Sequence, residues 1–141
     1  MPGRLKTPDS IDYKAEIWNP SAIEPRELAP GINAKITWGE KVMLSLVILD
    51  PNAVVPEHSH VHEQMGMLVS GTMEFSIEGK KTTLSGNEMY LVPGGVRHSA
   101  KAGPEGAVVL DAFSPPREEY KRRPGSSPLP TRSAVPPRRK K

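Results

Sequence analysis

Short strand-like segments, separated by turn residues, follow one another along most of this chain and constrain its fold more than any other feature. Gly, Pro, Asn or Asp stands between neighbouring segments. The predicted strands are residues 34–38, 42–49, 65–69, 73–77, 82–84, 88–92 and 107–113. No segment combines the length, amphipathic period and caps of a helix, and there is no repeat of solenoid or propeller period. The pattern predicts an all-β fold.

The faces of two segments indicate a double-layered structure. Residues 44–49 are apolar on both faces, which predicts a strand enclosed between two sheets, whereas residues 73–78 alternate and predict one wet face. Tight turns are expected at Ser70-Gly71 and in residues 78–80 and 85–87, because Gly and Asn accept positive φ. A jelly roll pairs strands this short across two sheets and leaves an interior mouth for a ligand.

Composition predicts one domain with two extensions. The 141 residues, 36% of them hydrophobic, can bury one core. We expect an N-terminal arm at residues 1–24, a β-barrel domain at 25–120 and a basic tail at 121–141. The tail holds eight Lys and Arg and no acidic residue, so the net charge of +3 conceals a mildly acidic body. With few large apolar groups to offset its ordering entropy, the tail is expected to be disordered.

The composition of the chain also limits which partners and which cellular compartment we expect. The tail lacks the aromatic residues on which single-stranded nucleic acids stack, so a solvated extension is favoured over a nucleic-acid partner. The absence of cysteine excludes disulfides and Cys-based metal sites. No apolar run approaches a membrane span and the first residues do not resemble a secretory signal, so we expect a cytoplasmic protein without membrane partners. A homodimer that packs sheet against sheet would cover edge strands and is expected here.

All four histidines fall in two short clusters between strand-like segments. His58, His60 and His62 form the first cluster, and His98 follows a Pro-Gly-Gly bend. Alternate residues of a strand face one way, so His58 and His60 can reach the same ion, and Gln64 shares their parity. Three imidazoles and an amide oxygen suit one divalent transition metal such as Fe, Mn, Ni or Zn. His62 has the same parity and remains an alternative ligand.

Two stretches of the chain resemble the two motifs of the cupin superfamily. In the first motif, two histidines one residue apart precede an acidic or amide ligand and a Gly; in the second, a Gly opens a turn and a Pro-x-Gly bend delivers the last histidine. The matching residues are His58, His60, Gln64 and Gly71, followed by Gly86, Pro93, Gly95 and His98. The resemblance implies a cupin-type double-stranded β-helix, a jelly-roll barrel. Gln64 stands where most cupins have Glu, which leaves the metal site more cationic and attractive to an anionic substrate.

The KdgF-like cupins, a subgroup that acts in pectin degradation, carry Gln at this position, and the chain beyond the second motif is similar to theirs. That subgroup converts 4,5-unsaturated monouronates, left by pectate or alginate lyases, into linear ketonised sugars. The resemblance implies that Asp111 shuttles a proton, Arg117 clamps the substrate carboxylate and Phe113 packs on the sugar ring. Tyr90 and Met67 are further expected substrate-binding residues, with Tyr90 next to the metal ligands and Met67 at the mouth.

Several alternatives stay open at this point. The motif spacing places His62 and Glu63 beside the ligand slot rather than in it. Arg117 also suits a surface ion pair with Glu118 or Glu119. Three histidines and an amide would leave coordination positions for O₂, as in an Fe(II) cupin dioxygenase. A non-enzymatic sensor or small-molecule binder is the third alternative, because one scaffold hosts many roles.

Overall fold

The computed structural model describes residues 13–121 and confirms the all-β prediction. The strands of this part of the chain are β1 (Arg26–Ala29), β2 (Ile32–Trp38), β3 (Met43–Leu49), β4 (Val54–His58), β5 (Glu63–Ile77), β6 (Lys80–Leu84), β7 (Met89–Val92) and β8 (His98–Ser114). Its helices are two short 3-10 turns, η1 (Pro20–Ala22) and η2 (Glu118–Lys121). Residues 122–141 of the predicted disordered tail lie outside the described residues. No helix within 13–121 has the length and apolar character that a bilayer crossing requires.

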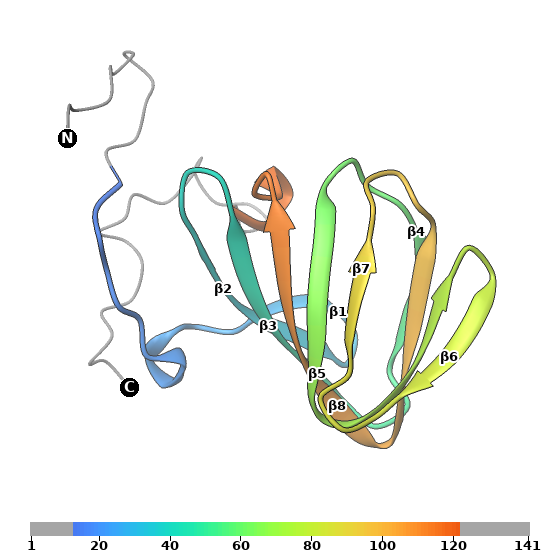
Figure 1. Cartoon of the computed structure of the whole chain (residues 1–141). Coiled ribbons are helices and arrows are strands. Elements are labelled where there is room, and N and C mark those ends of the chain that lie inside the picture. The colour runs from blue at the N-terminus through green and yellow to red at the C-terminus, as the bar shows by residue number, and fades with distance from the viewer. Residues whose placement is uncertain (1–12, 122–141) are drawn as a thin grey trace.

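Two long strands, β5 and β8, lie side by side and join the two sheets of the barrel (Figure 1). The first half of β5 pairs with β7 and with the end of β8, which in turn pairs with β3. The second half of β5 pairs with β6 and with the beginning of β8, which in turn pairs with β4. The first sheet therefore has the order β1-β2-β3-β8-β5-β7. The second sheet, which faces it, has the order β4-β8-β5-β6. This arrangement is the predicted jelly roll.

The passage of β5 from one sheet to the other depends on bulges and glycine. The pairing of β5 with β8 shifts register between Leu68 and Ser70 and again between Gly71 and Met73. Gly71 has φ 82°, and a Cβ added there would overlap the carbonyl oxygen of Gly106. Bulges bend a strand and increase its twist. The predicted turn at Ser70-Gly71 is therefore wrong, because the segments 65–69 and 73–77 are one continuous strand.

Two strands, β1 and β4, were missed, and β8 is much longer than predicted. β8 begins at His98, well before residue 107, because Gly103 and Pro104 resemble loop residues in sequence although Ala102 pairs with Met73. β4 contains Pro56, which usually disfavours a strand, but the proline lies where the pairing with β8 shifts register. β1 and β4 are short and lie at the ends of their sheets, so their patterns are weak.

The burial of β3 differs from the prediction. Met43, Ser45, Val47 and Leu49 are buried, whereas Leu44 is 47% exposed. The facing sheet covers only one side of β3, so the predicted enclosure between two sheets is wrong. The alternation predicted for residues 73–77 is confirmed, since the pattern of buried and exposed side chains there follows the period of a strand.

The turns predicted at 78–80 and 85–87 are confirmed. Glu78 and Gly79 have φ 52° and 82°, and Gly86 and Asn87 have φ 57° and 67°. These left-handed conformations are ones that Gly and Asn accept at low cost. The first turn closes the hairpin of β5 and β6, and the second directs the chain from β6 into β7.

The interior of the barrel is apolar except in one region. Its core includes Ile32, Ala34, Ile36, Met43, Val47, Leu49, Leu68, Met73, Phe75, Val92, Val109 and Phe113. Four buried polar side chains, those of Ser45, Gln64, His98 and Asp111, all line one cavity. Burying a polar group is costly unless it is hydrogen-bonded or binds a ligand. This cavity is therefore the candidate functional site.

Candidate metal centre and its cavity

Three histidines from separate segments converge at the cavity. His58 ends β4, His98 begins β8, and the two residues are direct partners in the β4–β8 ladder. Their ring centroids lie 4.3 Å apart. His60 lies in the loop between β4 and β5, with its ring centroid 4.9 Å from that of His98. One ligand atom from each of the three residues lies within 4.8 Å of the other two, which is the spacing of donors that could hold a metal ion.

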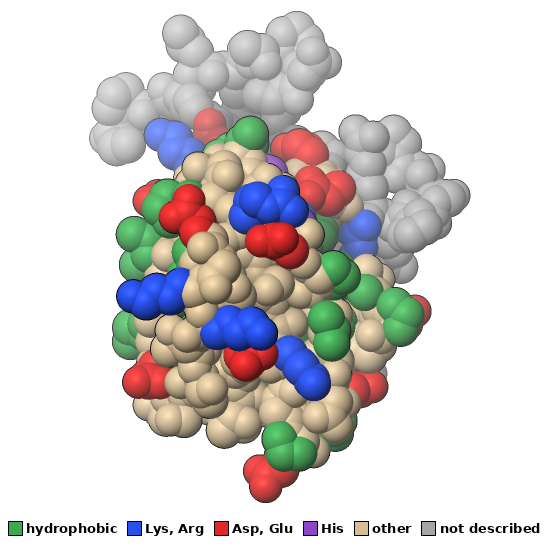
Figure 2. Space-filling model, turned by 90° about the vertical axis from the view of Figure 1, so that its right-hand side faces the viewer, with side chains coloured by type: hydrophobic (Ala, Val, Ile, Leu, Met, Phe, Trp, Pro, Cys, Tyr) green, Lys and Arg blue, Asp and Glu red, His purple; other side chains and the backbone are tan. Residues whose placement is uncertain are grey.

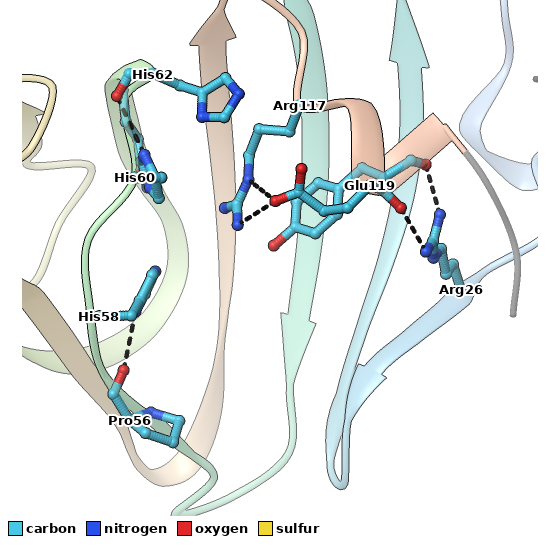
Figure 3. Close-up of polar contacts among 9 residues, drawn as sticks. Arg26, Pro56, His58, His60, His62, Arg117 and Glu119 are labelled. Atoms are coloured by element: carbon cyan, nitrogen blue, oxygen red, sulfur yellow. Dashed lines mark hydrogen bonds and ion pairs between the residues drawn. The ribbon is translucent and has the colours of Figure 1, made fainter.

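Backbone carbonyls fix how the three imidazoles are presented. The Nδ1 of His58 lies 2.9 Å from the carbonyl oxygen of Pro56, and that of His98 lies 2.9 Å from the carbonyl of Val96. The Nδ1 of His60 lies 3.1 Å from the carbonyl of His62 (Figure 3). Each Nδ1–H therefore donates to a carbonyl, which leaves the lone pair of each Nε2 available to bind a metal.

The protonation of these rings suits metal binding. Burial, followed by the charge of Arg117, lowers the pKa of His60 to about 4. Burial also lowers the pKa of His98. The Nε2 of His98 is buried and has no hydrogen-bond partner among the described residues. A neutral buried imidazole with an orphaned lone pair, beside two similar rings, fits a divalent transition metal.

Gln64 adds an oxygen to the same cluster. Its side chain is buried, and its Oε1 lies 3.1 Å from the Nε2 of His60. A hydrogen bond between Gln64 and Asp111 lowers the pKa of Asp111, so the Gln64 amide group donates toward that carboxylate. With its NH₂ directed at Asp111, the amide presents its oxygen to the histidines. Two lone pairs, one on Nε2 and one on Oε1, thus face each other, an arrangement that a cation between them would favour.

Asp111 is held by a row of residues across the first sheet. The ladders pair Asp111 with Ser45 on one side and with Gly66 on the other, and Gly66 pairs with Tyr90. The Tyr90 hydroxyl donates to Oδ1 of Asp111 at 2.6 Å. A Cβ on Gly66 would overlap both groups, so the absence of a side chain there lets Tyr90 reach the carboxylate. Burial raises the pKa of Asp111 to about 6, although the hydrogen bonds from Tyr90 and Gln64 oppose this shift.

Arg117 brings a positive charge to the cavity wall. Its guanidinium lies 4.2 Å from the centre of the Tyr120 ring and 5.1 Å from that of Phe113. Its Nη2 lies 2.9 Å from Oε2 of Glu119 (Figure 3). The ion pair that sequence alone left open is therefore formed with Glu119. The Arg117 side chain is only 11% exposed, and Arg117 also lines the cavity.

The cavity is large enough for a monosaccharide. Its volume is about 320 Å³, and most of its wall is apolar. The polar residues of the wall include His58, Gln64, Tyr90, His98, Asp111 and Arg117. Small-molecule sites typically combine such apolar walls with a few convergent polar groups.

Comparison with known proteins identifies the family. The Cupin domain family matches residues 45–113. "Pectin degradation protein KdgF" of Dickeya dadantii is 33% identical over 96 residues, which are 67% of this chain and 87% of that protein. The chain belongs to the cupin family. The resemblance found from its motifs is confirmed.

Two solved cupin structures match this chain over nearly their whole length. KdgF from Halomonas sp. superposes with a TM-score of 0.72 at 30% identity, over 76% of this chain and 99% of that one. An RmlC-like cupin from Shewanella frigidimarina gives a TM-score of 0.70 at 25% identity, over 75% of this chain and 96% of the other. Oxalate decarboxylase from Bacillus subtilis, at 21% identity and a TM-score of 0.60, shares the fold.

Most residues predicted for the cupin site are brought together, and one is not. Met67 is half-buried on the side of β5 opposite to Gln64 and Gly66, and it pairs with Leu110 away from the cavity. The predicted role of Met67 at the mouth is wrong, because strand alternation turns its side chain outward. The hydroxyl of Tyr90 is engaged by Asp111. His62 lies outside the group of three histidines, and Glu63 is exposed.

Sequence reasoning missed the residues that support this cupin site rather than form it. Gly66 gives a signal in sequence, since a glycine within an apolar strand often marks a close approach of other atoms. Arg26 gives none. It donates to the carbonyl oxygens of Tyr120 and Glu119 at 2.6 and 2.7 Å, and only the fold brings β1 to η2.

Proposed function

We propose that this cupin converts 4,5-unsaturated monouronates, the products of polysaccharide lyases, into linear ketonised sugars. The observation that carries the proposal is that Asp111, Arg117, His58 and His98 line one cavity, while His60 completes a group of three metal-competent imidazoles. An ionisable group with a pKa near 6 can both accept and deliver a proton near neutral pH. The relative named for pectin degradation supports the same substrate class.

We propose further that His58, His60, Gln64 and His98 hold one divalent transition metal, Fe, Mn, Ni or Zn. The three lone pairs on Nε2 and the amide oxygen are neutral donors, so a bound metal would keep its full positive charge. When bound, the metal would supply a Lewis acid that polarises substrate oxygens.

The chain's own residues account for the remaining requirements of the reaction. The Arg117 guanidinium would bind the substrate carboxylate, while Phe113 would pack on the sugar ring. Ring opening removes the proton from the anomeric hydroxyl and breaks the bond from the anomeric carbon to the ring oxygen. The aldehyde carbonyl forms at carbon 1 and the ring oxygen leaves as an enolate, which becomes the ketone at carbon 5 when a proton is added at carbon 4. Asp111 would accept the first proton and deliver the second, so the conversion is an isomerisation that needs no oxidant.

The proposal is tested with lyase-generated unsaturated monouronates and metal-loaded protein. We expect the absorbance of the conjugated double bond to decay much faster than in buffer. Decay no faster than in buffer would contradict the proposal. Consumption of O₂ with an added phenolic or diketone substrate would instead indicate a dioxygenase, and tight binding of the uronate without decay would indicate a binder.

We also propose that a second copy of the chain covers the outer face of the first sheet. Two cross-strand rows on this face are entirely apolar. They run Leu44–Ala112–Met65–Leu91 and Leu46–Leu110–Met67–Met89 over β3, β8, β5 and β7. Met65 is 55% and Met89 is 73% exposed. The face on the side of β4 and β6 instead carries intermixed acidic and basic side chains (Figure 2). An apolar patch of this kind can pack against its own copy across a two-fold axis.

Placing one charge on this face is expected to dissociate the dimer. Met65→Lys would bury an unpaired ammonium in the interface, whereas Thr83→Lys adds the same charge on β6 of the other sheet. Sedimentation equilibrium should give a dimer for the wild-type protein and for Thr83→Lys, and a monomer for Met65→Lys at micromolar concentration. A monomeric wild-type protein, or a dimer that Met65→Lys leaves intact, would refute the proposed interface.

A further inference from the structure

The guanidinium proposed to clamp the substrate already holds a carboxylate. Both Nε and Nη2 of Arg117 contact Oε2 of Glu119, at 3.0 and 2.9 Å. Glu119 belongs to η2, at the end of the described chain. The Arg117 side chain is 11% exposed, whereas that of Glu119 is 55% exposed. The carboxylate of Glu119 therefore lies between the cavity's only described Arg and solvent, where water can take over its solvation if it leaves.

Arg117 does not depend on Glu119 for its position. Its guanidinium stacks on the Tyr120 ring at 4.2 Å and lies 5.1 Å from the Phe113 centroid. Phe113 is buried in β8, and the two aromatic rings are themselves in contact, with centroids 6.0 Å apart. These rings hold the plane of the guanidinium whether or not a carboxylate is bound to its edge.

The backbone of η2 is held from another strand. Arg26 of β1 donates from Nη1 to the carbonyl of Tyr120 and from Nη2 to the carbonyl of Glu119. Figure 3 shows the two arginines on opposite sides of this segment, with Arg26 bound to its backbone and Arg117 bound to the Glu119 side chain. Release of the Glu119 carboxylate therefore requires a side-chain rotation and no movement of η2.

We propose that Glu119 occupies the carboxylate subsite of the free protein and that an anionic sugar binds by exchanging its own carboxylate for that of Glu119. This inference rests on the proposed function and identifies a residue that tunes the affinity of its carboxylate subsite. Two carboxylates can exchange on one guanidinium at little cost to the arginine. A neutral sugar offers only hydroxyl groups, which bind a guanidinium less strongly than a carboxylate does, so it cannot displace Glu119. Glu119 thus lowers the apparent affinity for acidic sugars, because their carboxylate must first displace that of Glu119.

The test measures binding separately from turnover. Galacturonate, a saturated uronate without the reactive double bond, and galactose, its neutral counterpart, would be titrated calorimetrically into metal-loaded protein. Glu119→Gln removes the competing charge, and we expect galacturonate to bind on the order of 5-fold more tightly. Galactose binding should not change. Glu118→Gln is the matched control, because Glu118 lies in the same helix but pairs with Lys121, at 3.1 Å. The Glu118→Gln variant should bind galacturonate with the wild-type affinity.

Each outcome separates this inference from the proposed function. Equal or weaker binding of galacturonate by Glu119→Gln overturns the exchange, since Glu119 would then orient Arg117 rather than compete for it. An equal gain in Glu118→Gln also overturns it, because the effect would be one of net charge. If neither the wild-type protein nor Glu119→Gln binds galacturonate, the subsite does not exist. Tighter binding by Glu119→Gln without decay of unsaturated uronates would reject the proposed reaction and support the exchange.

Discussion

Replacing His98 with alanine is expected to abolish stoichiometric metal binding. His98 is 3% exposed, and its Nε2, a proposed ligand atom, is buried and has no hydrogen-bond partner among the described residues. Removing it leaves two imidazoles and one amide oxygen, too few donors to hold a divalent ion against dialysis. Metal analysis after dialysis should give about one ion per chain for the wild-type protein and a loss of at least about 10²-fold in affinity for His98→Ala.

The control for this result lies in the same loop as His60. His62→Ala removes an imidazole outside the group of three histidines, so it should retain the metal at the wild-type level. Circular dichroism must show that both variants keep their β structure. Unchanged metal content in His98→Ala would refute the proposed ligand set. Loss of the metal from His62→Ala alone would show that His62 takes the place assigned to Gln64.

The local parts of this site could be predicted because they depend on short spacings. The spacing of His58, His60 and Gln64 is that of the cupin motif, but strand alternation does not explain it, because His60 lies in the loop between β4 and β5. The position of His98 opposite His58 follows from the cupin motifs rather than from any local pattern, because β4 meets β8 only in the folded barrel. The family resemblance therefore supplied the long-range pairing that periodicity could not.

The parts that were missed depend on tertiary structure. β5 and β8 are continuous through glycines that suggest turns, because each bulge is stabilised by the partner strand across from it. The outward direction of Met67 follows from parity with Gln64, yet a half-exposed methionine in an apolar strand resembles a core residue in sequence. The contact of Arg26 with η2 joins residues separated by most of the domain, and no sequence spacing encodes it.

Replacing Asp111 with asparagine is expected to lower the rate of uronate conversion by about 10³-fold while the metal is retained. Asparagine has nearly the shape of aspartate, and its Oδ1 can still accept the hydrogen bond from Tyr90. The amide cannot take up or release a proton, so both proposed proton transfers lose their carrier. Decay of the conjugated absorbance and the metal content of the same preparation are the two measurements.

Tyr90→Phe separates the proton carrier from its support. This variant keeps the Asp111 carboxylate and its hydrogen bond with Gln64 but removes the donor at 2.6 Å, so we expect a loss below about 10-fold. Equal losses in Tyr90→Phe and Asp111→Asn would show that the hydrogen-bonded pair, rather than the ionisable group, is what the reaction needs. Loss of the metal from Asp111→Asn would assign Asp111 a different role, that of orienting Gln64 toward the histidines. Retention of both metal and full activity would remove Asp111 from the mechanism.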